Sequence, residues 1–194
     1  MLLNSKFKLL FNLFFVVLYV FSGSSCTKIK NWIEAAKVIN EWVGKEIKFP
    51  ADVPCCILGK DTLSTLCADL FRKEYKVMLY VDSSGCSDCR LKLGEWKHVI
   101  SEADSLFHDR IGFVFFFQPK NMREMTYLFR QDEYDYPVFI DKNNTIDRLN
   151  HFPHEMKYQC FLLDKNNKVL VVGNPVLAPR VWALYKENIV KKVL

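Results

Sequence analysis

The sequence predicts an α/β fold, a three-layer sandwich whose mostly parallel sheet carries an antiparallel hairpin at one edge. From Tyr75 onward, apolar runs of strand length alternate with segments of helical periodicity. Two further apolar runs then flank a turn sequence, and a helical segment closes the chain. Half of the 194 residues are hydrophobic and 14% are aromatic. This is enough apolar surface for one core, and it excludes intrinsic disorder of the whole chain.

The alternating part of the chain supplies the elements in order. The expected strands of the parallel part are Lys76 to Val81, Ile111 to Phe117 and Pro137 to Ile140. The expected helices between and after them are Cys86 to Ala103, Asn121 to Gln131 and a short one near Ile146 to Asn150. The closing elements are strands Tyr158 to Leu163 and Val169 to Val172 around the turn Asp164-Lys165-Asn166-Asn167, then a helix from Ala178 to about Lys192. Strand–helix–strand units give parallel strands, and the last turn gives an antiparallel pair.

The segment before this alternation is less regular. Apolar residues from Ile29 to Val43 recur at spacings of three and four, which predicts an amphipathic helix that Gly44 ends. Glu46 to Phe49 and Pro54 to Leu58, with Gly59-Lys60-Asp61 as a turn, are expected to form a short hairpin. The segment from Leu63 to Phe71 fits a helix and a loop equally well.

The N-terminus has the pattern of a secretory signal. Lys6 and Lys8 precede an apolar run from Leu9 to Phe21, and small residues lead from there into Cys26. A cysteine at this place resembles the bacterial lipobox, in which the signal is removed and the new N-terminal cysteine is acylated. We therefore expect a signal peptide over 1–25, an anchor or spacer helix over 26–45 and a folded domain over 46–194. The expected location is extracytoplasmic, in the cell envelope, with a lipid anchor on Cys26.

The charge of the chain argues against one class of partner. The formal net charge is +5, and it falls to about +3 once Lys6 and Lys8 are removed with the signal. Such a modest excess of base indicates no nucleic-acid partner. The sequence implies no cofactor and leaves the oligomeric state open.

The chemistry-bearing motif is the segment Val81-Asp82-Ser83-Ser84-Gly85-Cys86-Ser87-Asp88-Cys89-Arg90. Its two cysteines stand between a predicted strand and a predicted helix, where they can form a disulfide or a dithiol. Cys89 heads an apolar stripe that continues down the helix, whereas Cys86 is left at the exposed tip. A helix N-terminus stabilises a thiolate, so Cys86 is the candidate nucleophile and Cys89 the resolving thiol. No second pair with metal-ligand spacing accompanies them, so we expect no metal site.

The segment from Lys76 to Val193 resembles the TlpA-like group of bacterial, membrane-tethered thioredoxin-like proteins, within the thioredoxin and peroxiredoxin superfamily. The resemblance rests on the cysteine pair followed by Arg90, on Tyr136-Pro137-Val138-Phe139-Ile140-Asp141 and on Phe161-Leu162-Leu163-Asp164. It implies a thioredoxin-like fold and thiol–disulfide exchange.

The chain departs from this family in three places. Gly85 precedes the first cysteine where the family has Trp, and Gly94 replaces a helix-kinking proline. Tyr158 stands where members carry a cis-proline that faces the disulfide and docks substrates. A cis bond before a non-proline residue costs about 2.5–4 kcal/mol, so we expect an altered substrate loop with a trans peptide at Tyr158.

These observations predict a thiol–disulfide oxidoreductase that acts on protein thiols and disulfides through Cys86 and Cys89, coupled to an upstream redox donor or acceptor. One alternative is a redox-silent envelope binding protein in which this pair is a structural disulfide. Another is a thiol peroxidase, because Ser83 stands three residues before Cys86, although Leu79 occupies the position of that family's proline.

The remaining cysteines have no evident role in exchange. Cys160 lies in an apolar run, which indicates a buried, hydrophobic thiol. Whether Cys55 or Cys56 pairs with Cys67 in a second disulfide stays open.

Overall fold

The computed structural model describes residues 29–60, 62–63, 67–83 and 91–191. The chain divides into two compact units, 1–41 and 42–194. Of the first unit, residues 29–41 are described and are helical, as the apolar spacing predicts. No helix in the described ranges combines the length and the apolar character that crossing a bilayer requires.

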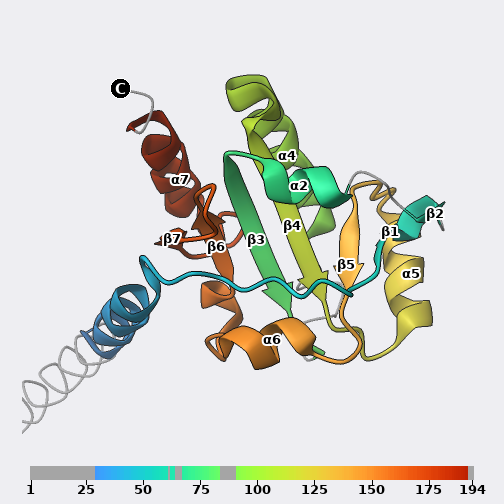
Figure 1. Cartoon of the computed structure of the whole chain (residues 1–194), viewed down its shortest axis with the longest axis horizontal. Helices are drawn as coiled ribbons and strands as arrows, with labels where there is room; N and C mark the ends of the chain where they lie inside the picture. The colour runs from blue at the N-terminus through green and yellow to red at the C-terminus, as the bar shows by residue number, and fades with distance from the viewer. Residues whose placement is uncertain (1–28, 61, 64–66, 84–90, 192–194) are drawn as a thin grey trace, which may run out of the picture. The chain divides into compact units, whose positions relative to one another are not determined.

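The second unit is built on one mixed β-sheet (Figure 1). Its strands are β1 (Cys55–Ile57), β2 (Thr62–Leu63), β3 (Tyr75–Val81), β4 (Ile111–Phe117), β5 (Val138–Ile140), β6 (Cys160–Leu163) and β7 (Val169–Val172). Among the described residues their order is β2-β1-β5-β4-β3-β6-β7. β3, β4 and β5 run parallel, while β6 pairs antiparallel with β3 and β7 with β6. The expected α/β sheet with an antiparallel edge hairpin is confirmed.

The helices of this unit are α2 (Cys67–Arg72), α4 (Leu93–Phe107), α5 (Met122–Gln131), α6 (Thr145–Asn150) and α7 (Pro179–Lys191). Strand side chains alternate between the two faces of the sheet, so each face has its own partners. On one face, Trp96 of α4 packs on Phe115 with ring centroids 4.9 Å apart, and Phe129 of α5 packs on Phe117 at 5.5 Å. Tyr185 of α7 contacts Cys160 of β6 on the same face.

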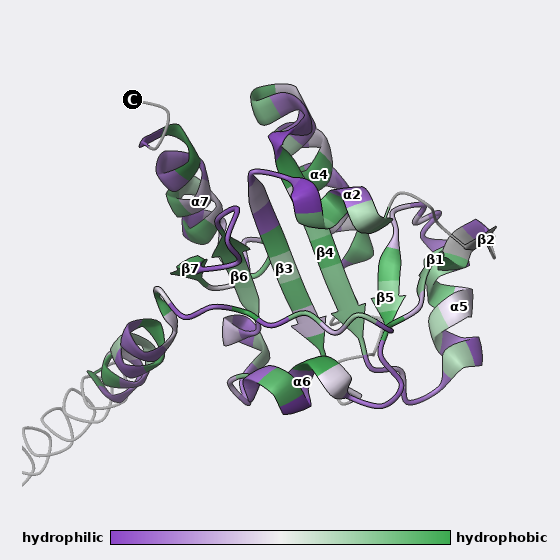
Figure 2. Cartoon of the chain, in the orientation of Figure 1, coloured by the Kyte–Doolittle hydropathy of each residue, from purple (hydrophilic) through white to green (hydrophobic). Residues whose placement is uncertain are grey.

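The opposite face is covered by α2, by α6 and by the segment that leads from Trp42 to β1. Phe49 stacks on Phe116 at 5.9 Å, and Phe71 of α2 lies 5.2 Å from Phe139. Trp42 packs on Phe161 at 5.0 Å. Figure 2 shows the result, hydrophobic central strands between helices that are polar on their outer sides.

The sequence-based prediction for the segment before β3 needs correction. The expected pairing of Glu46 to Phe49 with Pro54 to Leu58 is wrong, because β1 pairs instead with β2, across a turn close to the expected Gly59-Lys60-Asp61. Glu46 forms a bridge with Lys168, and the N–H of Ile47 donates to the carbonyl of Asn167 at 2.9 Å. This segment therefore lies beside the start of β7 before it crosses to β1. The ambiguous stretch from Leu63 to Phe71 holds the end of β2 and most of α2.

Lys76 is a charged residue in the middle of the sheet and is fully buried. Its ammonium group donates to the carbonyl oxygens of Phe71 and Lys73 at 3.4 Å and of Lys165 at 3.1 Å. Burial lowers the pKa of Lys76, and the nearby Asp164 carboxylate opposes that shift. Because a buried ammonium needs acceptors, these carbonyls tie the end of α2 to the β6–β7 turn.

Gly112 in β4 allows α2 to approach the sheet closely. A Cβ atom at this position would overlap the carbonyl oxygen of Leu70 and lie 3.1 Å from its carbonyl carbon. Gly94 in α4 is different, because a Cβ there meets nothing within 4 Å.

We therefore expect Gly112→Ala to lower the free energy of unfolding by about 1–3 kcal/mol, because backbone atoms of α2 have to move. Gly94→Ala is the matched control, and it should raise stability by about 0.5–1 kcal/mol because alanine restricts the unfolded chain and favours a helix. Urea titration of both variants gives the two values. Equal effects of the two substitutions would contradict this packing of α2.

Candidate functional site

The predicted redox motif begins where β3 ends. Val81 is the last residue of β3, and Asp82 and Ser83 follow as the last described residues before residue 91. Cys86 and Cys89, like Cys26, lie outside the described residues. The structure therefore locates the two ends of this segment.

The end of β3 is held from both sides. The N–H of Gln118, just after β4, donates to the carbonyl of Val81 at 2.9 Å. The N–H of Tyr80 donates to the carbonyl of Gln159, just before β6, at the same distance. The carboxyl ends of β3 and β4 and the amino end of β6 thus meet at one edge of the sheet, where ligands and substrates of open α/β sheets usually bind.

The chain returns to the core directly after the motif. Leu91 and Leu93 are 3% and 2% exposed, and α4 then buries Trp96, Ile100, Ala103 and Phe107. This is the apolar stripe expected from the sequence, confirmed for its described members. The expected helix from Cys86 is interrupted at Lys92, whose backbone is left-handed at φ 48° and ψ 47°, and α4 begins at Leu93, so the helical spacing does not continue back to Cys89.

Tyr158 lies next to this edge, in the 3-10 turn Met156–Tyr158 that precedes β6. Its side chain is 8% exposed, so the ring is buried, with the Lys157 ammonium 4.7 Å from its centroid. The described residues contain no cis peptide bond, in agreement with the expected trans bond at Tyr158. β6, which begins two residues after Tyr158, pairs antiparallel with β3.

Gln159 holds this loop in place, a role that the sequence did not reveal. It is 3% exposed, and its side-chain amide donates to the carbonyl of Pro153 at 2.9 Å. Its N–H donates to Met156 at 3.2 Å, which closes the 3-10 turn. The N–H of Asn174 donates to the carbonyl of Lys157 at 3.2 Å and fixes the other side of the loop. In the sequence, the only sign of this role is a glutamine directly before an apolar run. The predicted strand from Tyr158 to Leu163 included Gln159, so the turn before β6 was missed.

Cys160 is confirmed as a buried thiol. It is fully buried, and burial raises its pKa to about 12, while the contact with Tyr185 opposes that shift. The Tyr185 hydroxyl donates its proton to the carbonyl of Gly173 at 2.8 Å, so at 3.7 Å the Cys160 S–H is left as the donor to the Tyr185 oxygen. A thiol that stays protonated is a poor nucleophile, and Cys160 is unsuited to exchange at neutral pH.

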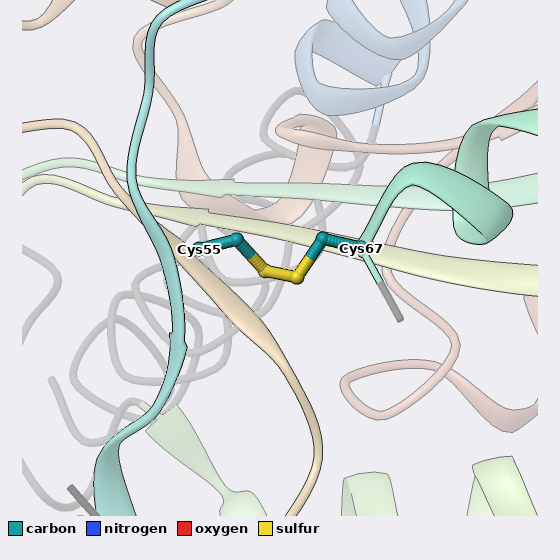
Figure 3. Close-up of a disulfide and its surroundings, with 2 residues drawn as sticks. All are labelled: Cys55 and Cys67. Atoms are coloured by element: carbon teal, nitrogen blue, oxygen red, sulfur yellow. A yellow bond between two sulfur atoms is a disulfide. The ribbon is translucent and has the colours of Figure 1, made fainter. Parts of the chain in front are cut away.

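The open question about a second disulfide has an answer. Cys55 of β1 is bonded to Cys67, the first residue of α2, with 6.4 Å between their Cα atoms (Figure 3). Cys56 points to the other face of β1 and packs against the main core. Cys67 therefore pairs with Cys55, the cysteine on the face of β1 that α2 covers.

Two described cavities lie at the opposite end of the parallel strands. They have volumes of about 380 and 520 Å³ and share Asp104 and Tyr136. Ile111 and Pro137, at the amino ends of β4 and β5, line the smaller one. Burial raises the pKa of Asp104, with a further contribution from Asp109. No group of three His, Cys, Asp or Glu among the described residues is arranged to hold a metal ion.

We expect Gln159→Met to lower the free energy of unfolding by about 1 kcal/mol, because the Pro153 carbonyl loses its donor while the volume is kept. Amides of 154–158 should then exchange faster with deuterium. Gln131→Met, at an exposed helix end, is the control and should change stability by less than about 0.5 kcal/mol. Unchanged exchange in 154–158 would show that Gln159 does not hold the loop.

The fold is similar to those of solved proteins. Peroxidoxin BcpB from Mycobacterium tuberculosis aligns with a TM-score of 0.52 at 15% identity, covering 75% of this chain and 97% of that chain. A thiol-disulfide oxidoreductase from Bacteroides fragilis gives 0.52 at 14% identity, covering 72% and 99%. The thioredoxin domain of a thiol-disulfide oxidoreductase from Bacteroides vulgatus gives 0.50 at 14%, covering 74% and 97%.

Comparison of the sequence itself was negative, since no family model and no curated protein matches it. Identities of this size establish the fold and nothing finer. The protein has a thioredoxin-like α/β fold.

Proposed function

We propose that this protein is a thiol–disulfide oxidoreductase of the TlpA-like kind, which exchanges disulfides with other proteins through Cys86 and Cys89. The observation that carries the proposal is the place of the motif in the chain. In the sequence it stands between β3 and α4 of a thioredoxin-like fold, and β3 ends at the sheet edge where β4 and β6 also meet. A stabilising disulfide needs no such position.

The exchange conserves atoms and electrons within the two proteins. The Cys86 thiolate attacks one sulfur of a substrate disulfide, the substrate S–S bond breaks, and its second sulfur leaves as a thiolate that takes up a proton. The Cys89 thiolate then attacks the Cys86 sulfur, the mixed disulfide breaks, and the substrate sulfur that Cys86 had attacked leaves as a thiolate that takes up a proton. Two electrons have passed to the substrate, and Cys86–Cys89 is left oxidised. The reverse sequence oxidises a substrate dithiol, so the donor or acceptor upstream decides the direction.

This division of roles is based on the sequence pattern, in which Cys89 heads an apolar stripe and Cys86 does not. A resolving thiol has to be shielded from partners, whereas the attacking thiol has to reach them. Tyr158 and the loop that Gln159 holds stand beside this edge, and we propose that they contact the bound substrate.

We expect Cys89→Ser to accumulate mixed disulfides with partner proteins in cells, because the first exchange step can proceed and the second cannot. Cys86→Ser, its matched control, should accumulate none. Non-reducing electrophoresis followed by mass spectrometry reads the result. Equal trapping by the two variants would remove the assignment of Cys86 as nucleophile.

We also propose that the domain works outside the cytoplasm, in the cell envelope, held there by a lipid on Cys26. The support is the sequence pattern of Lys6, Lys8, the apolar run and the small residues before the cysteine. An oxidising compartment also suits a chain with a disulfide between Cys55 and Cys67.

If this anchor is correct, Cys26→Ser should abolish labelling by a radioactive or clickable fatty acid and release the protein from the membrane fraction. Cys56→Ser is a suitable control, since it removes a thiol and leaves the signal intact. Labelling that survives Cys26→Ser would contradict the anchor.

A thiol peroxidase is the second candidate, because the peroxidoxin of Mycobacterium tuberculosis shares the fold and Ser83 stands three residues before Cys86. Consumption of hydrogen peroxide by the reduced protein, lost in Cys86→Ser, would favour the peroxidase over disulfide exchange. The third candidate is a redox-silent binding protein of the cell envelope, in which Cys86–Cys89 is a structural disulfide.

A further inference from the structure

The disulfide between Cys55 and Cys67 joins two elements that differ in how firmly the rest of the domain holds them. Cys55 belongs to β1, in the hairpin at the sheet edge, and Cys67 begins α2 (Figure 3). Cys55 is half-buried and Cys67 is 8% exposed. Which element the bond holds in place depends on the other contacts of each.

α2 is anchored independently of the disulfide. The Phe71 ring lies 4.9 Å from Phe49, and the backbone at Leu70 sits directly on Gly112 of β4. At the end of the helix, the buried Lys76 ammonium binds the carbonyl oxygens of Phe71 and Lys73. These contacts involve the core of the sheet, so α2 stays in place when the bond to Cys67 is cut.

The hairpin is held by short strand pairings and by the packing of its turn, Leu58–Lys60, on α5. β1 pairs with β5 at Cys55↔Phe139 and Cys56↔Val138, and with β2 at only two positions. The N–H of Ile140 adds a hydrogen bond to the carbonyl of Pro54 at 2.9 Å. All of β1 is half-buried, and Leu58 behind it is the buried anchor of the turn.

An ion pair at the hairpin tip contributes little. Lys60 and Asp135 are 3.6 Å apart, with side chains 62% and 67% exposed. Exposed pairs of this kind are screened by water and salt. The disulfide is the covalent constraint on this hairpin, which is otherwise held by short strand pairings and by the packing of its turn on α5.

We propose that the Cys55–Cys67 disulfide is a second redox site of this chain, a latch whose reduction by a dithiol opens the β1–β2 hairpin and uncovers the edge of β5. The attacking thiolate of the dithiol bonds to the half-buried Cys55 sulfur, and the S–S bond breaks with Cys67 leaving as a thiolate that takes up a proton. The second thiol of the reductant displaces Cys55. Two electrons enter the protein, and the reductant leaves as a disulfide.

This latch is independent of the exchange chemistry proposed for Cys86 and Cys89. It is tested in the full-length chain carrying Cys86→Ser and Cys89→Ser, with dithiothreitol as the dithiol. Hydrogen–deuterium exchange is followed by mass spectrometry, and alkylation of Cys55 and Cys67 reports that the bond has been reduced.

On reduction, amides of 55–58 and 138–140 should exchange about tenfold faster, because the closed loop no longer restrains the hairpin. Amides of β3 and β4 should keep their protection. Adding Cys56→Ser to the same chain removes the neighbouring thiol and should leave the response unchanged, which makes it the matched control.

Two results would overturn the latch. One is full alkylation of Cys55 and Cys67 with unchanged protection of 138–140, which would mean that Leu58 and the strand pairing suffice to hold the hairpin. The other is a bond that the dithiol reduces only after β3 and β4 lose their protection, since Cys55–Cys67 would then be a structural disulfide of the whole domain. Neither result bears on Cys86 and Cys89.

Discussion

The pairing of β3 with β4 is the constraint on which the rest of the domain depends. The two strands are aligned in parallel over their whole length, from Tyr75↔Ile111 to Val81↔Phe117, and every residue in both is buried. Parallel neighbours cannot be joined by a tight turn, so the chain has to cross over between them, and α4 lies in that crossover. The motif with Cys86 and Cys89 falls in the same connection, directly after the end of β3. Its position is thus a consequence of the strand pairing.

Burial of both sheet faces also explains the unusual polar groups of the second face. α4, α5 and α7 cover the first face with apolar side chains, whereas short α2, short α6 and an extended segment cover the other. Extended segments bring backbone groups into the interior, and these need partners. Asn150 meets this need, because its side chain accepts from the N–H of Lys48 and donates to the carbonyl of Lys48, both at 2.8 Å. The Lys76 ammonium likewise donates to the carbonyl oxygens of Phe71 and Lys73 at the end of α2.

Much of this fold could be predicted because its central strands are continuous apolar runs. The boundaries of β4 and β7 agree with the prediction from sequence, and β3 begins one residue earlier. The strand pairing predicted for Glu46 to Phe49 is wrong for a physical reason. Its partner Lys168 is far away in sequence, and no local pattern announces such a pairing.

The candidate site was predictable to a similar degree. Strand alternation showed that Cys55 and Cys56 face opposite sides but could not say which side α2 covers, so the partner of Cys67 needed the structure. The strand expected from Tyr158 begins at Cys160, and the Tyr158 ring is buried in the 3-10 turn before it. The loop is held through Gln159, whose amide reaches Pro153 across a turn that the sequence did not reveal.

The central claim is that Cys86 and Cys89 form a working redox pair, and their reduction potential tests it most directly. The full-length protein is equilibrated with glutathione or dithiothreitol buffers, and peptide mapping after alkylation separates this pair from Cys55–Cys67. The proposed function predicts a potential well above about −300 mV, in the range where partner proteins exchange electrons. A Cys86–Cys89 disulfide with a potential below about −300 mV in a folded protein would be structural, and it would contradict the account.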